Sequence, residues 1–499
     1  MLVGDIFSKT ANKKIDKVAA SLDEVKITYI ELEKKTNKLA HALIDLGVKT
    51  SDMVSIMLPN SIEFLTAYFG VIKSGATMVP LNISFKSPAV EYILNNSEAR
   101  ILITSKRFLS LIEKCELKYL EKIILVDKER VNDHILLSDF ADMPENLPQL
   151  ENIDEESAAA CLYTSGTTGK PKGAILTHHN LTFDTNKTIE FLNADDSDRY
   201  IVVLPMFHAF AETVCMLMPM LLGAEIVIID KFLPEKVLQT IQDKNITFFA
   251  GVPTMYTALL NVKNRDNYDL SYLNICLSGG AAMPQQTMED FEKVFNVKIL
   301  EGNGPTETSP VAYCNPVHGV RKSGSVGIPI PETRVKIVDS EDNELPRGEI
   351  GEITVQGDHV MKGYFKKPEA TAKTLRNGWL HTGDLGKMDE DGYIYIVDRK
   401  KDMINVGGMN VYPREIEEQL YKNPKIMEAA VVATKDELRG EVPKAVIVLK
   451  DGEKATEREI KRYCMEYFAN YKVPKLIEFI DELPRNATGK IDKKSLRDI

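Results

Sequence analysis

The sequence predicts an α/β protein: a large N-terminal domain of mostly parallel αβ-layered sheets plus a small β subdomain, and a mobile small α+β C-terminal domain. From residue 27 to about residue 300, apolar strand-like runs alternate with amphipathic helical segments, which is typical of parallel sheets covered by helices. Beyond Arg334 the pattern changes to short strands of period two between glycine and aspartate turns, which predicts an antiparallel layer. At 499 residues the chain exceeds what one hydrophobic core usually serves, so two or more domains are expected.

The elements of the large domain follow in order. A first helix, whose leucines fall on one face, ends at Gly47, and a second, over about residues 61–73, ends at Gly75. The strand TMVPLN comes directly after the second helix. Further strand-like runs begin at Ala99, Lys122, Ala158, Arg199, Ala224, Ile246 and Asn274.

A charged connector, DRKKD over residues 398–402, separates this pattern from a last module. The module contains a helix over about residues 413–421, the strands AAVVAT and KAVIVL, and a final helical stretch. Such a connector between two different patterns is a natural domain boundary. We therefore divide the chain into a large domain, residues 1–399, and a small C-terminal lid domain, residues 400–499.

Composition restricts the class of protein. The chain is 44% hydrophobic and 27% charged, as an ordinary globular protein is, and its net charge of −11 argues against a nucleic-acid partner. Its six cysteines are scattered without metal-ligand spacing, which favours a reducing cytoplasm and no structural zinc. The N-terminus lacks the apolar core of a secretory signal, and the longest apolar run, residues 214–224, is too short to span a bilayer. We expect a cytoplasmic protein without an integral membrane segment; loose membrane association stays open.

The most informative stretch is YTSGTTGKPKG, residues 163–173, directly after a predicted buried strand. Glycines let the backbone approach a ligand, successive N–H groups can line an anion-binding concavity, and hydroxyls and ammoniums add donors. Pro171 stands where a P-loop of the familiar kind requires a magnesium-binding Ser or Thr. A flexible linker is the less favoured alternative, because linkers rarely follow a buried strand. The predicted phosphate-binding residues are Thr164, Ser165, Gly166, Thr167, Thr168, Gly169 and Lys170.

This loop resembles the phosphate loop of the acyl-adenylate-forming enzymes, which include acyl-CoA synthetases, aryl-CoA ligases, luciferases and the adenylation domains of peptide synthetases. Further segments resemble that family's motifs, in the family's order: PMFHAF (205–210), SGGAAMP (278–284), GNGPTET (302–308), WLHTGD (379–384), DRKKD (398–402) and PRNATGKI (484–491). The resemblance covers about residues 27–490. It implies that a carboxylate attacks the α-phosphorus of ATP, that pyrophosphate leaves, and that the acyl-AMP then acylates a thiol; ATP, Mg²⁺ and the co-substrate CoA are the implied cofactors.

The resemblance also implies roles for residues around the acid and the base. His208 would line the acyl pocket beside the substrate carboxylate, although a lone histidine is more often a core residue. Amino-acid adenylation domains have an aspartate here, so an amino-acid substrate is disfavoured. Gly280, Ala281 and Ala282 would contact adenine. Some of the Met and Leu residues after His208 would line an apolar tunnel, where ~0.8 kcal/mol per buried methylene makes chain-length selectivity gradual.

A second group of implied roles surrounds the phosphates. Thr306 would bond the α-phosphate, Glu307 would hold Mg²⁺, and Asn303 and Gly304 would contact the nucleotide. The family usually has a tyrosine, stacked on adenine, at the position of Asn303. Because base–aromatic stacking is worth ~1–3 kcal/mol, weakened ATP binding is expected.

The remaining implied roles lie towards the C-terminus. Asp384 and Arg399 would bond the ribose, and Lys401 would be the hinge about which the small domain turns between half-reactions. Lys490 would bridge the substrate carboxylate and the α-phosphate during adenylation. Gly407 and Gly408 would line the pantetheine tunnel once the small domain has turned.

Three segments together resemble bacterial long- or medium-chain fatty acid–CoA ligases: ILEGNGPTE (299–307), MKGYFKKPEAT (361–371) and VDRKKDMINVGGMNVYPREIE (397–417). The expected partners are therefore a fatty acid or other carboxylic acid, ATP and CoA, and a homodimer stays open. The alternatives are an aryl-acid–CoA ligase of the coumarate or benzoate type, an acyl-AMP ligase that loads a separate carrier protein, and a non-catalytic nucleotide-binding relative.

Overall fold

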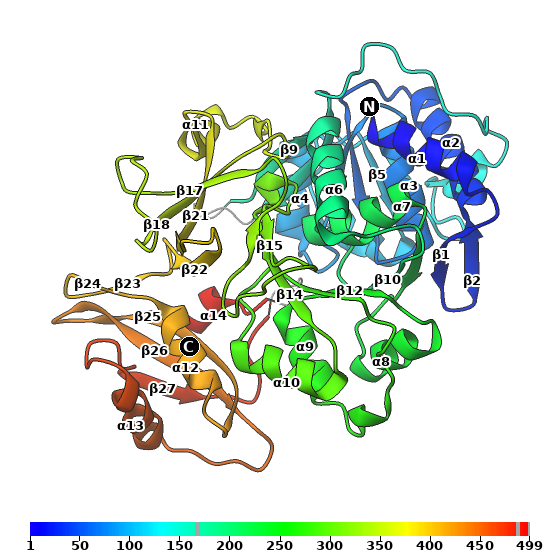
Figure 1. The fold of residues 1–499 in the computed structure, drawn as a ribbon. Helices are drawn as coiled ribbons and strands as arrows, with labels where there is room; N and C mark the ends of the chain where they lie inside the picture. The colour runs from blue at the N-terminus through cyan, green and yellow to red at the C-terminus, as the bar shows by residue number, and fades with distance from the viewer. Residues whose placement is uncertain (165–169, 486–489, 498–499) are drawn as a thin grey trace.

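The computed structural model describes residues 1–164, 170–485 and 490–497. It has the predicted α/β class: a large N-terminal domain with parallel sheets and a small C-terminal domain (Figure 1). No helix in the described ranges is long and apolar enough to cross a membrane.

The first large sheet runs in the order β19-β9-β8-β4-β3-β5-β6-β7. Its six strands from β8 to β7 are parallel, whereas β9 and β19 are added antiparallel at one edge. The strands are β3 (Met53–Met57), β4 (Thr77–Pro80), β5 (Ile101–Thr104), β6 (Lys122–Leu125), β7 (Ile135–Leu136), β8 (Ala158–Thr164), β9 (Lys172–Thr177) and β19 (Gly363–Tyr364).

The second large sheet runs in the order β16-β15-β14-β13-β12-β10-β11-β1-β2 and is parallel from β14 to β1. Its strands are β1 (Val18–Leu22), β2 (Val25–Thr28), β10 (Arg199–Val202), β11 (Glu225–Ile228), β12 (Phe248–Gly251), β13 (Ile275–Ser278), β14 (Ile299–Asn303), β15 (Tyr313–Cys314) and β16 (Ile328–Pro329). The strand-like runs predicted between Ala99 and Asn274 are thus confirmed as strands of these two sheets.

Helices surround the sheets and separate them. The predicted second helix is α3 (Ile62–Lys73); the Ser61 side chain accepts the Phe64 N–H, and every residue except Glu63 is buried, as an apolar helix enclosed on all sides requires. The first predicted helix is α2 (Tyr29–Asp45), which starts with a capping box from Thr28 to Glu31. The other helices of the large domain are α1 (Val3–Lys13), α4 (Ser87–Ser97), α5 (Leu109–Ile112), α6 (His178–Leu192), a π-helix (Ala211–Leu217), α7 (Met218–Leu222), α8 (Pro234–Asp243), α9 (Pro253–Leu260), α10 (Gln285–Phe295) and α11 (Pro368–Thr374).

The small antiparallel layer predicted beyond Arg334 is a five-stranded sheet with β17-β18-β21-β20 in order and β22 paired to β21. Its strands are β17 (Arg334–Val338), β18 (Gly351–Gln356), β20 (Leu375–Arg376), β21 (Trp379–Met388) and β22 (Ile394–Arg399). Its last strand, β22, ends at Arg399, within the charged connector of residues 398–402.

The C-terminal domain has its own sheet and its own hydrophobic clusters. The strands are β23 (Ile404–Val406), β24 (Met409–Val411), β25 (Ile426–Asp436), β26 (Gly440–Leu449) and β27 (Leu476–Phe479), and the helices are α12 (Pro413–Tyr421), α13 (Glu457–Tyr467) and α14 (Lys493–Arg497). Figure 1 shows this domain, in orange and red, below the yellow antiparallel sheet and beside α10 and β14. Gly280, just after β13, lies against Lys490, and Glu301 of β14 lies 3.9 Å from Arg414 of α12, so a site shared by the two domains can form here.

Candidate active site

The predicted phosphate loop joins two antiparallel strands at the edge of the first sheet. Residues Ser165–Gly169 lie outside the described ranges, but Thr164 ends β8, and Thr164 pairs with Lys172 of β9. On the far side of the loop, the Tyr92 hydroxyl donates to the Pro171 carbonyl (3.0 Å), and the Lys170 ammonium lies 5.6 Å from the Tyr92 ring centroid. The predicted strand before the loop is confirmed as β8, and Tyr92, to which the sequence assigned no role, holds the start of the return strand.

The GNGPTET turn leaves the end of β14 and enters a 3₁₀ turn at Thr306–Thr308. A Cβ at Gly304 would lie 2.0 Å from the Pro310 carbonyl oxygen, so no other residue fits there without moving backbone. The Thr308 hydroxyl closes the turn by donating to the Pro305 carbonyl (2.9 Å). The chain is thus held in one shape on both sides of Thr306 and Glu307.

Glu307, in the 3₁₀ turn, is held by a tyrosine from β19. The Tyr364 hydroxyl donates to Glu307 Oε1 at 2.6 Å, and the Lys172 ammonium lies 4.9 Å from the Tyr364 ring centroid. Burial, together with the nearby Glu307 carboxylate, raises the Tyr364 pKa, so the hydroxyl keeps its proton. Because β19 pairs with β9, Tyr364 connects Glu307 to the strand that follows the phosphate loop. Tyr364 lies in MKGYFKKPEAT, which resembles fatty acid–CoA ligases, but the sequence analysis predicted no role for this residue.

Asp384 and Arg399 face each other across two strands of the small sheet. They are register partners on β21 and β22, and Arg399 Nε lies 3.3 Å from Asp384 Oδ1. Burial raises the pKa of Asp384, and the Arg399 guanidinium opposes that shift. The buried Asp384 carboxylate lies beside the half-exposed Arg399 guanidinium. Its two oxygens can accept hydrogen bonds from two neighbouring hydroxyls.

Lys490, from the end of the chain, reaches into the large domain. A Cβ at Gly280 would lie 3.1 Å from Lys490 Cε, and Gly280 has a φ of +78°, so glycine both permits the turn and makes room for the lysine. Gly280, Lys490 and His208 line one small cavity of ≈ 10 Å³, about the space one water needs. The structure therefore brings together three predicted residues that are far apart in the sequence.

Two titratable groups, His208 and Lys490, share this cavity, and the pKa of each is lowered. Burial and the Lys490 charge lower the His208 pKa to about 3, so the imidazole is neutral. The Phe210 N–H donates to His208 Nδ1 (3.2 Å), which places the remaining proton on Nε2. Burial and Arg399 lower the Lys490 pKa to about 8, against the opposing charge of Asp384. A neutral donor and an ammonium of reduced pKa therefore share the space where a carboxylate could lie.

The adenine side of the predicted site lies at the ends of β13 and β14. Ala281 and Ala282 lie in the turn after β13, and this turn is tied to β14 because the Met283 N–H donates to Glu301 Oε1 (3.0 Å). Asn303 ends β14, and its Oδ1 is buried without a hydrogen-bond partner among the described residues. An orphaned buried acceptor favours a ligand that brings a donor, such as an exocyclic amine.

Three other predicted residues, Gly407, Gly408 and Lys401, are exposed at the surface. Gly407 and Gly408 form the exposed turn between β23 and β24, with φ values of +59° and +90°, and a Cβ on either would meet nothing within 4 Å. Lys401 lies in the connector between β22 and β23 and is also exposed. In the observed orientation these two glycines face open space and do not line the cavity around Lys490.

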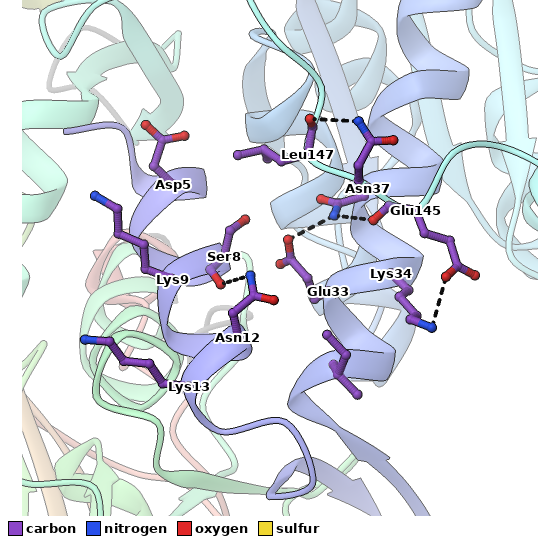
Figure 2. Close-up of a pocket in the computed structure, with 12 residues that line it drawn as sticks. Asp5, Ser8, Lys9, Asn12, Lys13, Glu33, Lys34, Asn37, Glu145 and Leu147 are labelled. Atoms are coloured by element: carbon purple, nitrogen blue, oxygen red, sulfur yellow. Dashed lines mark hydrogen bonds and ion pairs between the residues drawn. The ribbon is translucent and has the colours of Figure 1, made fainter.

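A larger groove lies elsewhere, between α1 and α2 (Figure 2). It encloses about 710 Å³, and none of the predicted site residues lines it. Two of its amide side chains bond to groups on the same helix: Asn12 donates to the Ser8 backbone carbonyl (2.8 Å), and Asn37 donates to Glu33 Oε1 (2.9 Å). This groove lacks the convergent motifs, so the candidate active site is the one around Lys490 and Glu307.

Comparison with known proteins identifies the family. The AMP-binding enzyme family matches residues 7–365, and the AMP-binding enzyme C-terminal domain matches residues 415–490. A long-chain-fatty-acid–CoA ligase of Bacillus subtilis is 38% identical over 98% of this chain and 93% of its own, and a feruloyl-CoA synthase of Amycolatopsis is 36% identical over 94% and 93%. Among solved structures, an anthranilate CoA ligase in complex with anthranoyl-AMP superposes with a TM-score of 0.93 at 32% identity, over 100% of this chain and 97% of that one. The chain therefore belongs to the AMP-binding enzyme family.

Proposed function

We propose that this enzyme activates a fatty acid with ATP and transfers the acyl group to CoA. A carboxylate oxygen of the acid attacks the α-phosphorus, the bond to pyrophosphate breaks, and acyl-AMP forms. The sulfur of CoA then attacks the acyl carbonyl carbon, the thiol loses its proton, and AMP leaves. The observation that carries the proposal is that Lys490 lies against Gly280 beside His208, where its ammonium can stabilise charge on both the carboxylate and the α-phosphate.

The chain's own residues would divide the work of the first step. The His208 Nε2–H would orient the acid, while Asp384 and Arg399 would hold the ribose. Asn303, Gly304 and Thr306, with the turn from Gly280 to Ala282, would hold the base and the α-phosphate, and the phosphate loop the remaining phosphates. Positioning and charge neutralisation suffice, because the acid is itself the nucleophile.

The donor set near Glu307 fits Mg²⁺, which proteins usually hold by one or two carboxylates together with substrate phosphates. Among the described residues no group of three or more His, Cys, Asp or Glu side chains could hold a metal by itself, which agrees with a metal that arrives with the nucleotide. When bound, Mg²⁺ neutralises phosphate charge. Glu307 would hold the ion, and Tyr364 would keep the carboxylate in place.

A fatty acid is the preferred substrate class, since the relative at 38% identity is named for long-chain fatty acids. The rival is an aryl acid, which the feruloyl-CoA and anthranilate relatives favour. The second half-reaction would need the domain of residues 400–499 to turn about Lys401 and bring Gly407 and Gly408 to the acyl-AMP. Because ATP and CoA are cytoplasmic substrates, we place the reaction in the cytoplasm.

The deciding experiment measures pyrophosphate release with a panel of acids, namely saturated fatty acids of increasing length, ferulate, benzoate and amino acids, each with and without CoA. We expect release with fatty acids, rising gradually with chain length, and acyl-CoA only when CoA is present. Higher kcat/KM for ferulate or benzoate would assign the aryl-acid function instead. No release with any acid would overturn the proposal.

The pH dependence of adenylation should report Lys490. Because the lysine acts as a cation and its pKa in the free enzyme is about 8, kcat/KM for ATP–pyrophosphate exchange should fall as the pH rises through about 8. Bound phosphates raise the pKa of a neighbouring ammonium, so the fall in kcat should occur at higher pH. His208 should add no transition near neutral pH, because its pKa is about 3. Identical midpoints for kcat and kcat/KM would contradict this assignment.

Tyr364→Phe should raise the Mg²⁺ concentration that gives half-maximal exchange about tenfold, because a hydrogen bond to a charged group contributes ~1.5–3 kcal/mol. Tyr393→Phe is the matched control, since the Tyr393 hydroxyl donates to the Val320 backbone carbonyl and not to Glu307. The measurement is a Mg²⁺ titration of exchange at fixed free ATP. Equal Mg²⁺ requirements in the two variants would show that Tyr364 does not orient Glu307.

Asn303→Tyr should lower the KM for ATP, since an aromatic ring at this position can stack on adenine for ~1–3 kcal/mol. Asn303→Leu is the control for size without an aromatic face, and it should not improve binding. The KM for ATP in the exchange reaction measures the effect. An unchanged value for Asn303→Tyr would show that the stacking surface is supplied by another residue.

A further inference from the structure

Arg414 makes most of its contacts across the connector between the two domains. It lies in the first turn of α12, in the C-terminal domain, and its side chain is only 12% exposed. Its backbone N–H donates to Asp398 Oδ2 (3.0 Å), and its Nη1 donates to the Ile396 carbonyl (2.8 Å). Both partners belong to β22, the last strand of the large domain.

The same guanidinium faces a buried acid of the large domain. Arg414 Nη2 lies 3.9 Å from Glu301 Oε1, and the Glu301 side chain is 1% exposed. Glu301 Oε1 also accepts the Met283 N–H, but Glu301 Oε2 has no hydrogen-bond partner in the described part of the chain. A buried carboxylate is costly without an opposite charge, so Glu301 depends on a cation that comes from the other domain.

A neighbouring acid strengthens the same contact. Glu418, one turn further along α12, pairs with Arg414 (3.8 Å), and its Oε2 accepts the backbone N–H of Gln285 (3.4 Å). Gln285 is the first residue of α10, and the first N–H groups of a helix lack partners within the helix and favour an anion. One turn of α12 thus ties the C-terminal domain to β22, β14 and the start of α10.

We propose that Arg414 is the positioning residue that holds the C-terminal domain in the adenylate-forming orientation, with Glu301 as its anchor. The inference rests on the proposed function, because the orientation in which Arg414 meets Glu301 is also the one in which Lys490 lies against Gly280. A rotation of the C-terminal domain about Lys401 would separate Arg414 from Ile396, Asp398 and Glu301. Arg414 therefore shifts the equilibrium between the two domain orientations toward the adenylate-forming one, without touching a substrate.

The first test compares the half-reactions in Arg414→Gln. ATP–pyrophosphate exchange should fall roughly tenfold, within the range of typical coupling between two conformations, and thioester formation from supplied acyl-AMP should not fall. Lys472→Met is the matched control, because Lys472 pairs with Glu415 of the same helix (2.7 Å) without crossing to the large domain. It should leave both half-reactions unchanged.

A double-mutant cycle with Glu301→Gln tests the anchor. Gln keeps the acceptor for the Met283 N–H but removes the charge, so Glu301→Gln should also slow exchange, and the double variant should be no slower than Arg414→Gln alone. Multiplicative losses, or equal losses in both half-reactions, would overturn the proposal. If the wild-type enzyme showed no exchange with any acid, the proposed function itself would fail, which is a different result from a wild-type enzyme whose Arg414 variants keep their exchange rate.

Discussion

Lys490→Ala should abolish acid-dependent ATP–pyrophosphate exchange and yet form thioester from supplied acyl-AMP. In the proposed reaction the ammonium would stabilise charge that develops during attack on the α-phosphorus, and removing one such preorganised donor typically costs ~10²–10³ in kcat. The second half-reaction starts from an acyl-AMP that is already activated, so it does not need this charge. Single-turnover measurements of each half-reaction, on the same preparation, would give the two rates.

Lys494→Ala is the matched control for this variant, because Lys494 is an exposed lysine in α14, four residues further along the chain. It should retain both half-reactions. Equal loss of both half-reactions in Lys490→Ala would contradict the two-conformation mechanism. Either the lysine would then be needed in both half-reactions, or the variant would be misfolded. Comparing the Tm of the two variants separates those causes.

Gly408→Leu should have the opposite effect, sparing exchange and reducing thioester formation about a hundredfold. The turn of Gly407 and Gly408 is exposed in the observed orientation, and a Cβ on Gly408 meets nothing within 4 Å, so adenylation has no steric reason to suffer. If the domain turns as proposed, a bulky side chain at this position would occupy the proposed pantetheine tunnel. If the thiol can no longer approach the acyl carbonyl in line, we expect the activation free energy to rise by ~3 kcal/mol, which lowers the rate by about two orders of magnitude.

The Gly408 variant needs a control for backbone strain, because its φ of +90° disfavours any side chain. Gly452→Leu provides it: Gly452 has a φ of +79°, also has open space around its Cβ position, and lies in a turn between β26 and α13 of the same domain. This control should keep both half-reactions. A comparable loss of thioester formation in Gly452→Leu would mean that strain, and not tunnel access, explains the Gly408 result.

Local features of the sequence were sufficient to predict most of the fold. The alternation of strands and helices up to β14 and the period-two strands beyond Arg334 each depend on neighbouring residues, and both were confirmed. For Gly304 the resemblance implied only a contact with the nucleotide, and the structure adds that a Cβ there would collide with the Pro310 carbonyl. Periodicity and turn residues can therefore be interpreted without coordinates, whereas the steric reason for a particular glycine cannot.

Contacts between distant segments were not predictable in the same way. Tyr364 and Arg414 lie in segments that resemble fatty acid–CoA ligases. A single Tyr or Arg in a sequence, however, does not indicate which distant residue it will contact. Tyr364 acquires a role because β19 pairs with β9 and brings its hydroxyl to Glu307. Arg414 acquires one because α12 packs beside β14, where Glu301 is buried.

By itself, the sequence determined the α/β class, the motif order and the residue types that can hold a nucleotide, because these depend on backbone propensity and on the chemistry of single side chains. Only the tertiary structure decided that Lys490 lies against Gly280 and that the pKa values of Lys490 and His208 both fall. The physical reason is that burial and charge separation depend on how two domains pack, and no local pattern records the free energy of that packing.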